Sequence, residues 1–225
     1  MSEPVPPLPS DPGDLKAPDL ATFEALANRA YQGLPGDFRA LCRDLVIRVE
    51  DFPTEDVLKE MQAETDFDLL GLFQGLGMPF QSVQHSGAMP NMIWLYRRPI
   101  LDYWAEHDET LGDIVTHVLV HEIGHVLDWR SHKHLSQTVS AETGASQCDL
   151  DNPSVACVFD TQRAVEPPPG NPAEPYAGVS TEEYWAEVFA TTVYPEYYGQ
   201  STANNLVGPQ TADVVKTTLR GLGAE

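Results

Sequence analysis

Two histidines and a glutamate stand at a spacing that favours metal chemistry, in the segment His121-Glu122-Ile123-Gly124-His125. Because a helix has 3.6 residues per turn, His121 and His125 would lie one turn apart on one face, where both imidazoles could bind one zinc ion. Glu122 would not bind the metal; in sites of this pattern the glutamate takes a proton from the attacking water. The motif predicts a zinc hydrolase with Zn2+ as its cofactor.

The residues around the motif indicate that it lies on a buried helix. Thr110 to Trp129 is apolar around most of its circumference, and Thr110 is expected to cap its first turn. Polar side chains in such a helix need partners, because an unpaired buried polar group is costly. The alternative is an ordinary amphipathic helix with two histidines on its polar face. We expect His117, one turn before His121, to be a hydrogen-bonded histidine and not a ligand.

A catalytic zinc site also requires a third protein ligand and an open position for water. The metzincin class of zinc peptidases has a third histidine six residues after the second, where this chain has Ser131. Metzincins also have a methionine turn downstream, and no methionine follows Met92. The sequence therefore argues against a metzincin.

Five segments of the first half of the chain form a joint pattern: Phe38-Arg39-Ala40-Leu41, Val46 to Asp51, Asp68 to Gly75, Leu95 to Ile100 and His121 to His125. Together they resemble the minimal zincins, a family of small bacterial zincin-like metallopeptidases, over roughly residues 36 to 125. The resemblance implies a zincin fold and peptidase activity. In that family a glycine and then an aspartate follow the second histidine, at the positions of Asp128 and Ser131, so the family's candidate third ligand is absent here.

A second pattern begins near Ser180, which forms an SxxE capping box with Glu183 and precedes an apolar helical run. The run Glu183 to Ala190 resembles the glutamate helix of gluzincins, most closely those similar to anthrax lethal factor and the Pro-Pro endopeptidases. That resemblance implies Glu183 as the zinc ligand, Glu187 as its supporting acid, and Tyr176, seven residues before Glu183, as a catalytic tyrosine that stabilises the oxyanion. The same group has the pattern HExGHxxD, matched here by His121, Glu122, Gly124, His125 and Asp128.

Helix geometry supports the same two acids. Glu183 and Glu187 would lie one turn apart, so that one could bind zinc while the other accepts an N–H from a ligand histidine. Glu182, which would point to another face, is the alternative ligand, and ordinary solvated acids are the alternative to both. Asp128 would orient a ligand or neighbouring backbone, or it is simply an acid at a helix end.

The elements that would position these residues predict an α+β fold. We expect a zincin-like fold, with a small mixed sheet, an antiparallel edge strand over the HExxH helix, and a C-terminal glutamate helix. Asn91 to Arg98 is our candidate for the edge strand, with an ordinary sheet strand as the alternative, and Asp68 to Gly77 is expected to form turns. A further strand is expected over Leu45 to Phe52. Helices are expected at 20–30, 35–42, 57–62 with Thr54 as cap, 100–107, 110–129, from 180 toward 195, and 211–222.

The domain organisation follows from composition. Residues 1–19 are rich in proline and acids and are expected to be a disordered lead. Residues 20–225 are expected to form a single catalytic domain with a long irregular insertion at 131–178, because that stretch is polar and proline-rich. Cys148 and Cys157 bracket part of it, and free thiols are expected unless the chain meets an oxidant.

A formal charge of −21 disfavours nucleic acid and anionic membranes as partners. The N-terminus has no readable export signal and no apolar run is long enough to span a bilayer, so we expect a cytoplasmic protein. The expected partner is a peptide or protein substrate, and the oligomeric state stays open.

Three functional hypotheses follow. The first is a zinc metallopeptidase with His121, His125 and Glu183 as ligands, Glu122 as general base and Tyr176 as oxyanion donor. The second is a zinc-binding regulatory or protein-binding module without turnover. The third is a peptidase that the 131–178 insertion holds inactive until it is cut or displaced.

Overall fold

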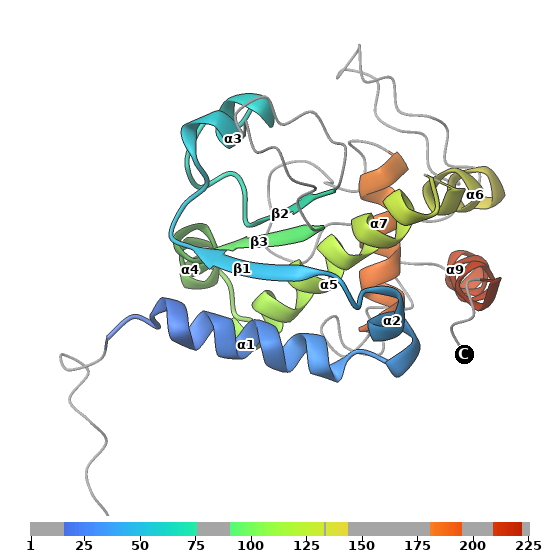
Figure 1. Cartoon of the computed structure of the whole chain (residues 1–225), viewed down its shortest axis with the longest axis horizontal. Helices are drawn as coiled ribbons and strands as arrows, with labels where there is room; N and C mark the ends of the chain where they lie inside the picture. The colour runs from blue at the N-terminus through green and yellow to red at the C-terminus, as the bar shows by residue number, and fades with distance from the viewer. Residues whose placement is uncertain (1–15, 76–90, 133, 144–180, 195–208, 222–225) are drawn as a thin grey trace, which may run out of the picture.

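The computed structural model describes residues 16–75, 91–132, 134–143, 181–194 and 209–221 (Figure 1). The first half contains both helices and strands, and only helices follow in the described part of the second half. In chain order they are α1 (Leu20–Gly33), α2 (Gly36–Leu41), β1 (Val46–Glu50), α3 (Glu55–Glu60), β2 (Gly71–Gln74), β3 (Met92–Tyr96), α4 (Arg97–Glu106), α5 (Leu111–Arg130), α6 (His134–Thr143), α7 (Thr181–Val193) and α9 (Pro209–Gly221). The predicted mixed α+β fold is confirmed.

The sheet has three strands in the order β1-β3-β2 in the described part of the chain. β1 is parallel to β3, and β2 is antiparallel to it. β3 is therefore the central strand, and our assignment of Asn91 to Arg98 as the edge strand was wrong. The reason is visible in the run Met92–Tyr96, where four of the five residues are buried, as is typical of a strand covered on both faces.

Among the described strands, β2 is the antiparallel edge strand. We expected turns over Asp68 to Gly77, and that prediction was also wrong, since Gly71–Gln74 pairs with β3 from Gly71↔Leu95 to Gln74↔Met92. Four residues are too few to show an alternating pattern, and glycines flank or begin the strand. Its position depends on pairing with β3, which no local sequence signal reveals.

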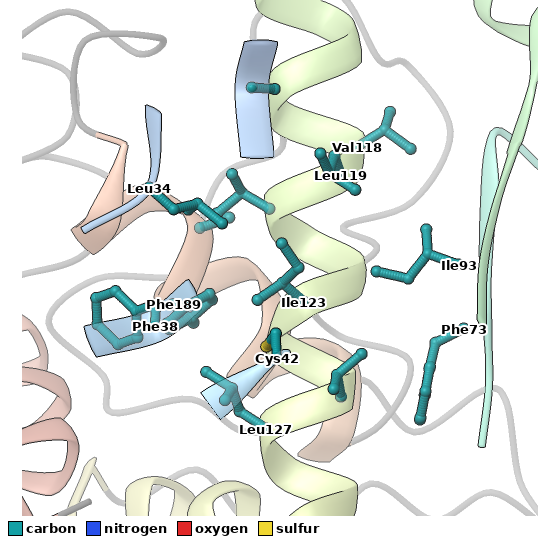
Figure 2. Close-up of a cluster of buried hydrophobic side chains, with 14 of the residues drawn as sticks. Leu34, Phe38, Cys42, Phe73, Ile93, Val118, Leu119, Ile123, Leu127 and Phe189 are labelled. Atoms are coloured by element: carbon teal, nitrogen blue, oxygen red, sulfur yellow. The ribbon is translucent and has the colours of Figure 1, made fainter. Parts of the chain in front are cut away.

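α5 is the central helix, and it lies between the sheet and helices that include α1 and α7 (Figure 2). On one side it meets Phe73 of β2 and Ile93 of β3, and on the other it meets Leu34, Phe38 and Phe189. Most residues from Ile114 to Asp128 are buried. This burial explains why apolar residues occupy most of the circumference of the helix. α5 is also the element from which the candidate site is built.

Side-chain caps fix where several helices begin. The Thr110 hydroxyl accepts a hydrogen bond from the Asp113 N–H at 3.2 Å, and Thr54 accepts from Val57 in the same way. Asp19 caps α1 by accepting from Thr22 N–H at 2.9 Å. Each cap satisfies a backbone donor that the helix leaves unpaired. The predicted starts at Thr54 and Thr110 are confirmed.

The start of the predicted irregular insertion differs from expectation, because α6 occupies His134–Thr143. Leu135 and Val139 are buried against the core, and α6 packs against α7 and α9. The prediction of an irregular segment is therefore wrong for these residues. The rest of the insertion, with Cys148, Cys157 and Tyr176, lies outside the described residues, as do Ser180 and residues 1–15.

Two further observations concern the described residues. No helix among them is both long enough and apolar enough to cross a membrane. Cys42 is a free thiol buried in the core.

Candidate metal centre

Two helices bring three candidate ligands together. His121 and His125 lie on α5, and Glu183 lies in the first turn of α7. The Nε2 atoms of the two histidines are 3.1 Å apart, and Glu183 Oε2 lies 3.1 Å from His121 Nε2 and 3.3 Å from His125 Nε2. Within the described residues, this is the set of histidine, cysteine and acidic side chains whose atoms could hold one metal ion.

The donor set fits zinc. Two imidazole nitrogens and one carboxylate oxygen are the ligands of a common type of catalytic zinc site. Tetrahedral bonds of about 2.0–2.1 Å place ligand atoms about 3.3–3.4 Å apart, close to the 3.1–3.3 Å that separate the three donors here. Three such donors leave a fourth position for water or substrate.

A glycine allows α7 to approach α5 closely enough to deliver Glu183. A Cβ on Gly124 would lie 2.9 Å from the backbone Cα of Ala186, so no side chain fits at this position without a shift of the helix. The Trp185 Nε1–H donates to the Gly124 carbonyl at 2.8 Å, in a hydrogen bond that is fully buried. These contacts fix the register between the two helices, and that register places Glu183 beside the histidines.

Glu187 contacts the His121 ring on the side away from Glu183. The His121 Nδ1–H donates to Glu187 Oε2 at 3.2 Å, while its Nε2 faces Glu183. The same Glu187 oxygen lies 3.8 Å from His117 Nε2. Such a carboxylate fixes the orientation and tautomer of a ligand histidine. His117 thus lies next to the supporting acid and outside the set of three donors.

Glu122 projects from α5 toward β2. The Phe73 N–H donates a hydrogen bond to its carboxylate, and a Cβ on Gly71 would lie 2.9 Å from Glu122 Oε1. β2 can therefore contact this acid because Gly71 has no side chain. Burial raises the pKa of the Glu122 carboxyl, an effect that His125 and His121 partly offset.

Opposite charges stabilise one another across the three donors. Burial disfavours a charged His121, but the carboxylates of Glu183 and Glu187 outweigh it and raise the His121 pKa well above its ordinary value. Burial also opposes the charge on Glu183, yet His125 and His121 hold the pKa of this carboxyl far below its ordinary value. The site therefore already favours a positive charge at the point where the donors converge.

The comparison with known families agrees with this geometry. Residues 42–139 match the zincin-like metallopeptidase family. No curated protein matches the chain in a sequence search. The matched segment includes the sheet, α5 and the first part of α6. The resemblance described in the sequence analysis ends at residue 125, so the family match extends further along the chain. It supports a zinc-dependent peptidase, and it ends before α7, so it assigns no role to Glu183.

The remaining predicted residues of the zincin-like site lie in different places. Asp128 accepts the Ser136 N–H at 2.8 Å, so it orients backbone at the start of α6, one of the two roles we expected. Glu182 is not among the three converging donors, although its charge contributes to the raised pKa of Asp128, which burial mainly causes. Tyr176 lies outside the described residues.

The sequence reasoning missed the residues that set distances in the zincin-like site. Gly71, Phe73 and Trp185 carry no chemistry of their own, and their contacts link segments far apart in the chain. Gly124 did offer a signal, because a glycine inside a buried helix is unfavourable unless another backbone approaches closely.

Proposed function

We propose that the protein is a zinc-dependent metallopeptidase of the gluzincin type, with His121, His125 and Glu183 as the metal ligands. The observation that carries this proposal is the convergence of their donor atoms to within 3.3 Å, from α5 and α7, at distances that suit tetrahedral zinc. The family match covers residues 42–139 and does not include Glu183. It therefore supports the peptidase class independently of the assignment of Glu183 as a ligand.

The proposed chemistry is hydrolysis of a peptide or protein substrate. Zinc held by these ligands would polarise the scissile carbonyl and acidify the attacking water. Glu122 takes the proton from that water and delivers it to the leaving amine. The Phe73 N–H keeps the carboxylate in place between them.

Two further residues assist in this proposal. Glu187 holds the His121 ring so that its Nε2 faces the metal position. Tyr176 donates a hydrogen bond to the oxyanion, a role that rests on its spacing from Glu183 in the gluzincin resemblance. Among the described strands, β2 pairs with β3 along one edge only. The substrate lies extended along the other edge of β2 and pairs with it as an added strand.

Metal content and peptide cleavage test this assignment together. The zinc content of each purified variant is measured by elemental mass spectrometry. Glu183→Ala should contain little zinc. Glu182→Ala, its matched control on the same helix turn, should keep both zinc and activity. Glu122→Gln should keep zinc and lose cleavage of a mixed peptide library by about 10²–10⁴-fold, because proton transfer contributes a factor of that size.

Each result has an opposite that contradicts the proposal. Unchanged zinc affinity in Glu183→Ala, or loss of zinc in Glu182→Ala, would show that the third ligand is assigned wrongly. Turnover retained by zinc-loaded Glu122→Gln would exclude the general base. Stoichiometric zinc in the unaltered protein with no cleavage of any peptide would favour the regulatory module instead.

A further inference from the structure

A surface groove of about 720 Å³ lies where the C-terminal half of α4 meets the ends of the segments after β1 and before β2. It shares no lining residue with the metal centre, and nothing in the proposed mechanism uses it. Its lining combines apolar, acidic and histidine side chains, chiefly Phe52, Phe67, Trp104, Asp102, Asp108 and Glu109.

Three aromatic side chains of this groove are open to solvent. The exposed fractions are 36% for Phe52, 45% for Phe67 and 38% for Trp104. The two phenylalanine rings meet edge to face with centroids 5.3 Å apart, so they form one continuous apolar surface. Exposed apolar surface rimmed by polar groups is typical of a binding site.

The charges around the aromatic surface are predominantly negative. Asp102, Asp108 and Glu109 line the groove against a single arginine, Arg98. Trp104, Ala105 and His107 lie at the C-terminal end of α4, where the last backbone carbonyls of the helix add partial negative charge. The groove therefore favours a cation.

Two polar atoms in the groove lining have no hydrogen-bond partner within the described residues. The His107 Nδ1–H donates to the Tyr103 carbonyl at 2.6 Å. His107 Nε2 and Glu109 Oε2 are both buried without a partner. Both atoms are closed off from solvent, so a ligand with N–H donors reaches them only when the lining side chains shift, and the hydrogen bond to Glu109 then offsets the cost of its unpaired oxygen.

We propose that this groove, defined by the six side chains named above, binds an arginine side chain carried by an extended segment of a partner protein. Arginine matches all of the observations, because its planar guanidinium stacks on aromatic rings, offers five N–H donors and keeps its positive charge. Lysine would bind more weakly, since its compact ammonium is more strongly hydrated.

Charge disfavours two occupants, a second copy of this chain and its first fifteen residues. A second copy of this chain brings a net charge of −21. Residues 1–15 of the chain contain acidic residues and no lysine or arginine. The occupant we assign is a basic segment of a different protein, and its binding does not depend on the proposed peptidase activity.

Binding of short labelled peptides tests the proposal. The probes are fluorescein-labelled peptides of Gly and Ser with a central Leu-Arg-Leu, Leu-Lys-Leu, Leu-Gln-Leu or Leu-Glu-Leu, titrated with the full-length protein and followed by anisotropy. Mass spectrometry of each sample checks that the peptide stays intact. The arginine peptide should bind at least about ten-fold more tightly than the glutamine peptide and weaken as salt rises.

Variants locate the site. The double variant Asp102→Asn/Asp108→Asn should weaken binding of the arginine peptide by about five-fold or more. Phe67→Ala should weaken binding of every peptide that the unaltered protein binds, because each carries the same two leucines. The matched controls are Asp56→Asn, an exposed acid on α3, and Met61→Ala, a residue of similar exposure to Phe67 that does not line the groove. Both should bind as the unaltered protein does.

Three peptide-binding outcomes would overturn the proposal. These are equal affinity for the glutamate and arginine peptides, unchanged arginine-peptide affinity in the double acid variant, and an equal loss in Asp56→Asn. A self-association that saturates the groove before peptide is added, seen by ultracentrifugation, would identify a second copy as the occupant and would equally overturn it.

Discussion

Replacing Gly124 by alanine should separate α7 from α5 and weaken the metal site. The new Cβ would lie 2.9 Å from the Ala186 Cα, which is backbone and cannot rotate away. Carbon atoms in contact lie about 3.5–4.0 Å apart, so α7 must retreat by about 0.6–1.1 Å. Glu183 Oε2, now 3.1 Å and 3.3 Å from the two histidine nitrogens, would then lie about 4 Å from them if α7 moves as a rigid body.

The expected effect on zinc exceeds the effect on stability. Zinc ligand distances tolerate changes of about 0.2 Å, so the affinity measured by competition with a chromogenic chelator should fall by at least about ten-fold. Overpacking costs about 1–3 kcal/mol, and alanine returns about 1 kcal/mol of helix propensity. The net loss of about 1 kcal/mol should lower the Tm by about 2–4 °C.

Gly112→Ala is the matched control on the same helix. Its Cβ would lie 3.2 Å from Arg29 Nη2, at the end of a flexible side chain that can move aside. This variant should keep the zinc affinity and the Tm of the unaltered protein, or gain slightly in Tm. If Gly124→Ala and Gly112→Ala bind zinc equally well, the close helix contact does not position Glu183 and the reasoning is refuted.

Three other perturbations should give separate results. Gly71→Ala places a Cβ 2.9 Å from Glu122 Oε1, so a peptide-cleavage assay should show a loss of about 10²-fold while metal analysis shows zinc still bound; loss of zinc would contradict this. Asp128→Ala removes the acceptor of the Ser136 N–H, and urea unfolding should show a destabilisation of about 1–3 kcal/mol; an unchanged midpoint would exclude this role. Burial raises the pKa of the Cys42 thiol to about 11, so only about one thousandth of it is thiolate at pH 8. A maleimide pulse at that pH followed by peptide mapping should find Cys42 unlabelled in the native protein and labelled in urea.

The parts of the fold that the sequence predicts well are those with a local cause. Thr110 was assigned as a cap because a side-chain oxygen there can accept from the first turn, and it does. Glu183 and Glu187 were paired because residues four apart share a helix face, and both now lie within 3.2 Å of one His121 ring. Their proximity to His121 also required the two helices to meet, which the resemblance to gluzincins implied and periodicity alone did not.

The errors concern elements that other parts of the chain hold in place. β2 is a strand because β3 supplies its hydrogen bonds, and β3 is central because β1 and β2 flank it. α6 is stabilised by the burial of Leu135 and Val139 and by an acceptor from α5. Tertiary contacts of this kind override weak local preferences.

The site depends on two glycines that act on opposite sides of α5. Gly124 lets α7 approach and so determines how far Glu183 lies from the histidines, whereas Gly71 lets β2 approach and so determines where Glu122 lies. In the proposed mechanism the first distance controls metal binding and the second controls proton transfer. The two alanine variants should therefore fail differently: Gly124→Ala should recover cleavage as zinc is raised, because its ligands are weakened but its base is intact, and Gly71→Ala should not recover at any zinc concentration. Recovery of both variants with zinc would show that the base and the ligands are not positioned independently.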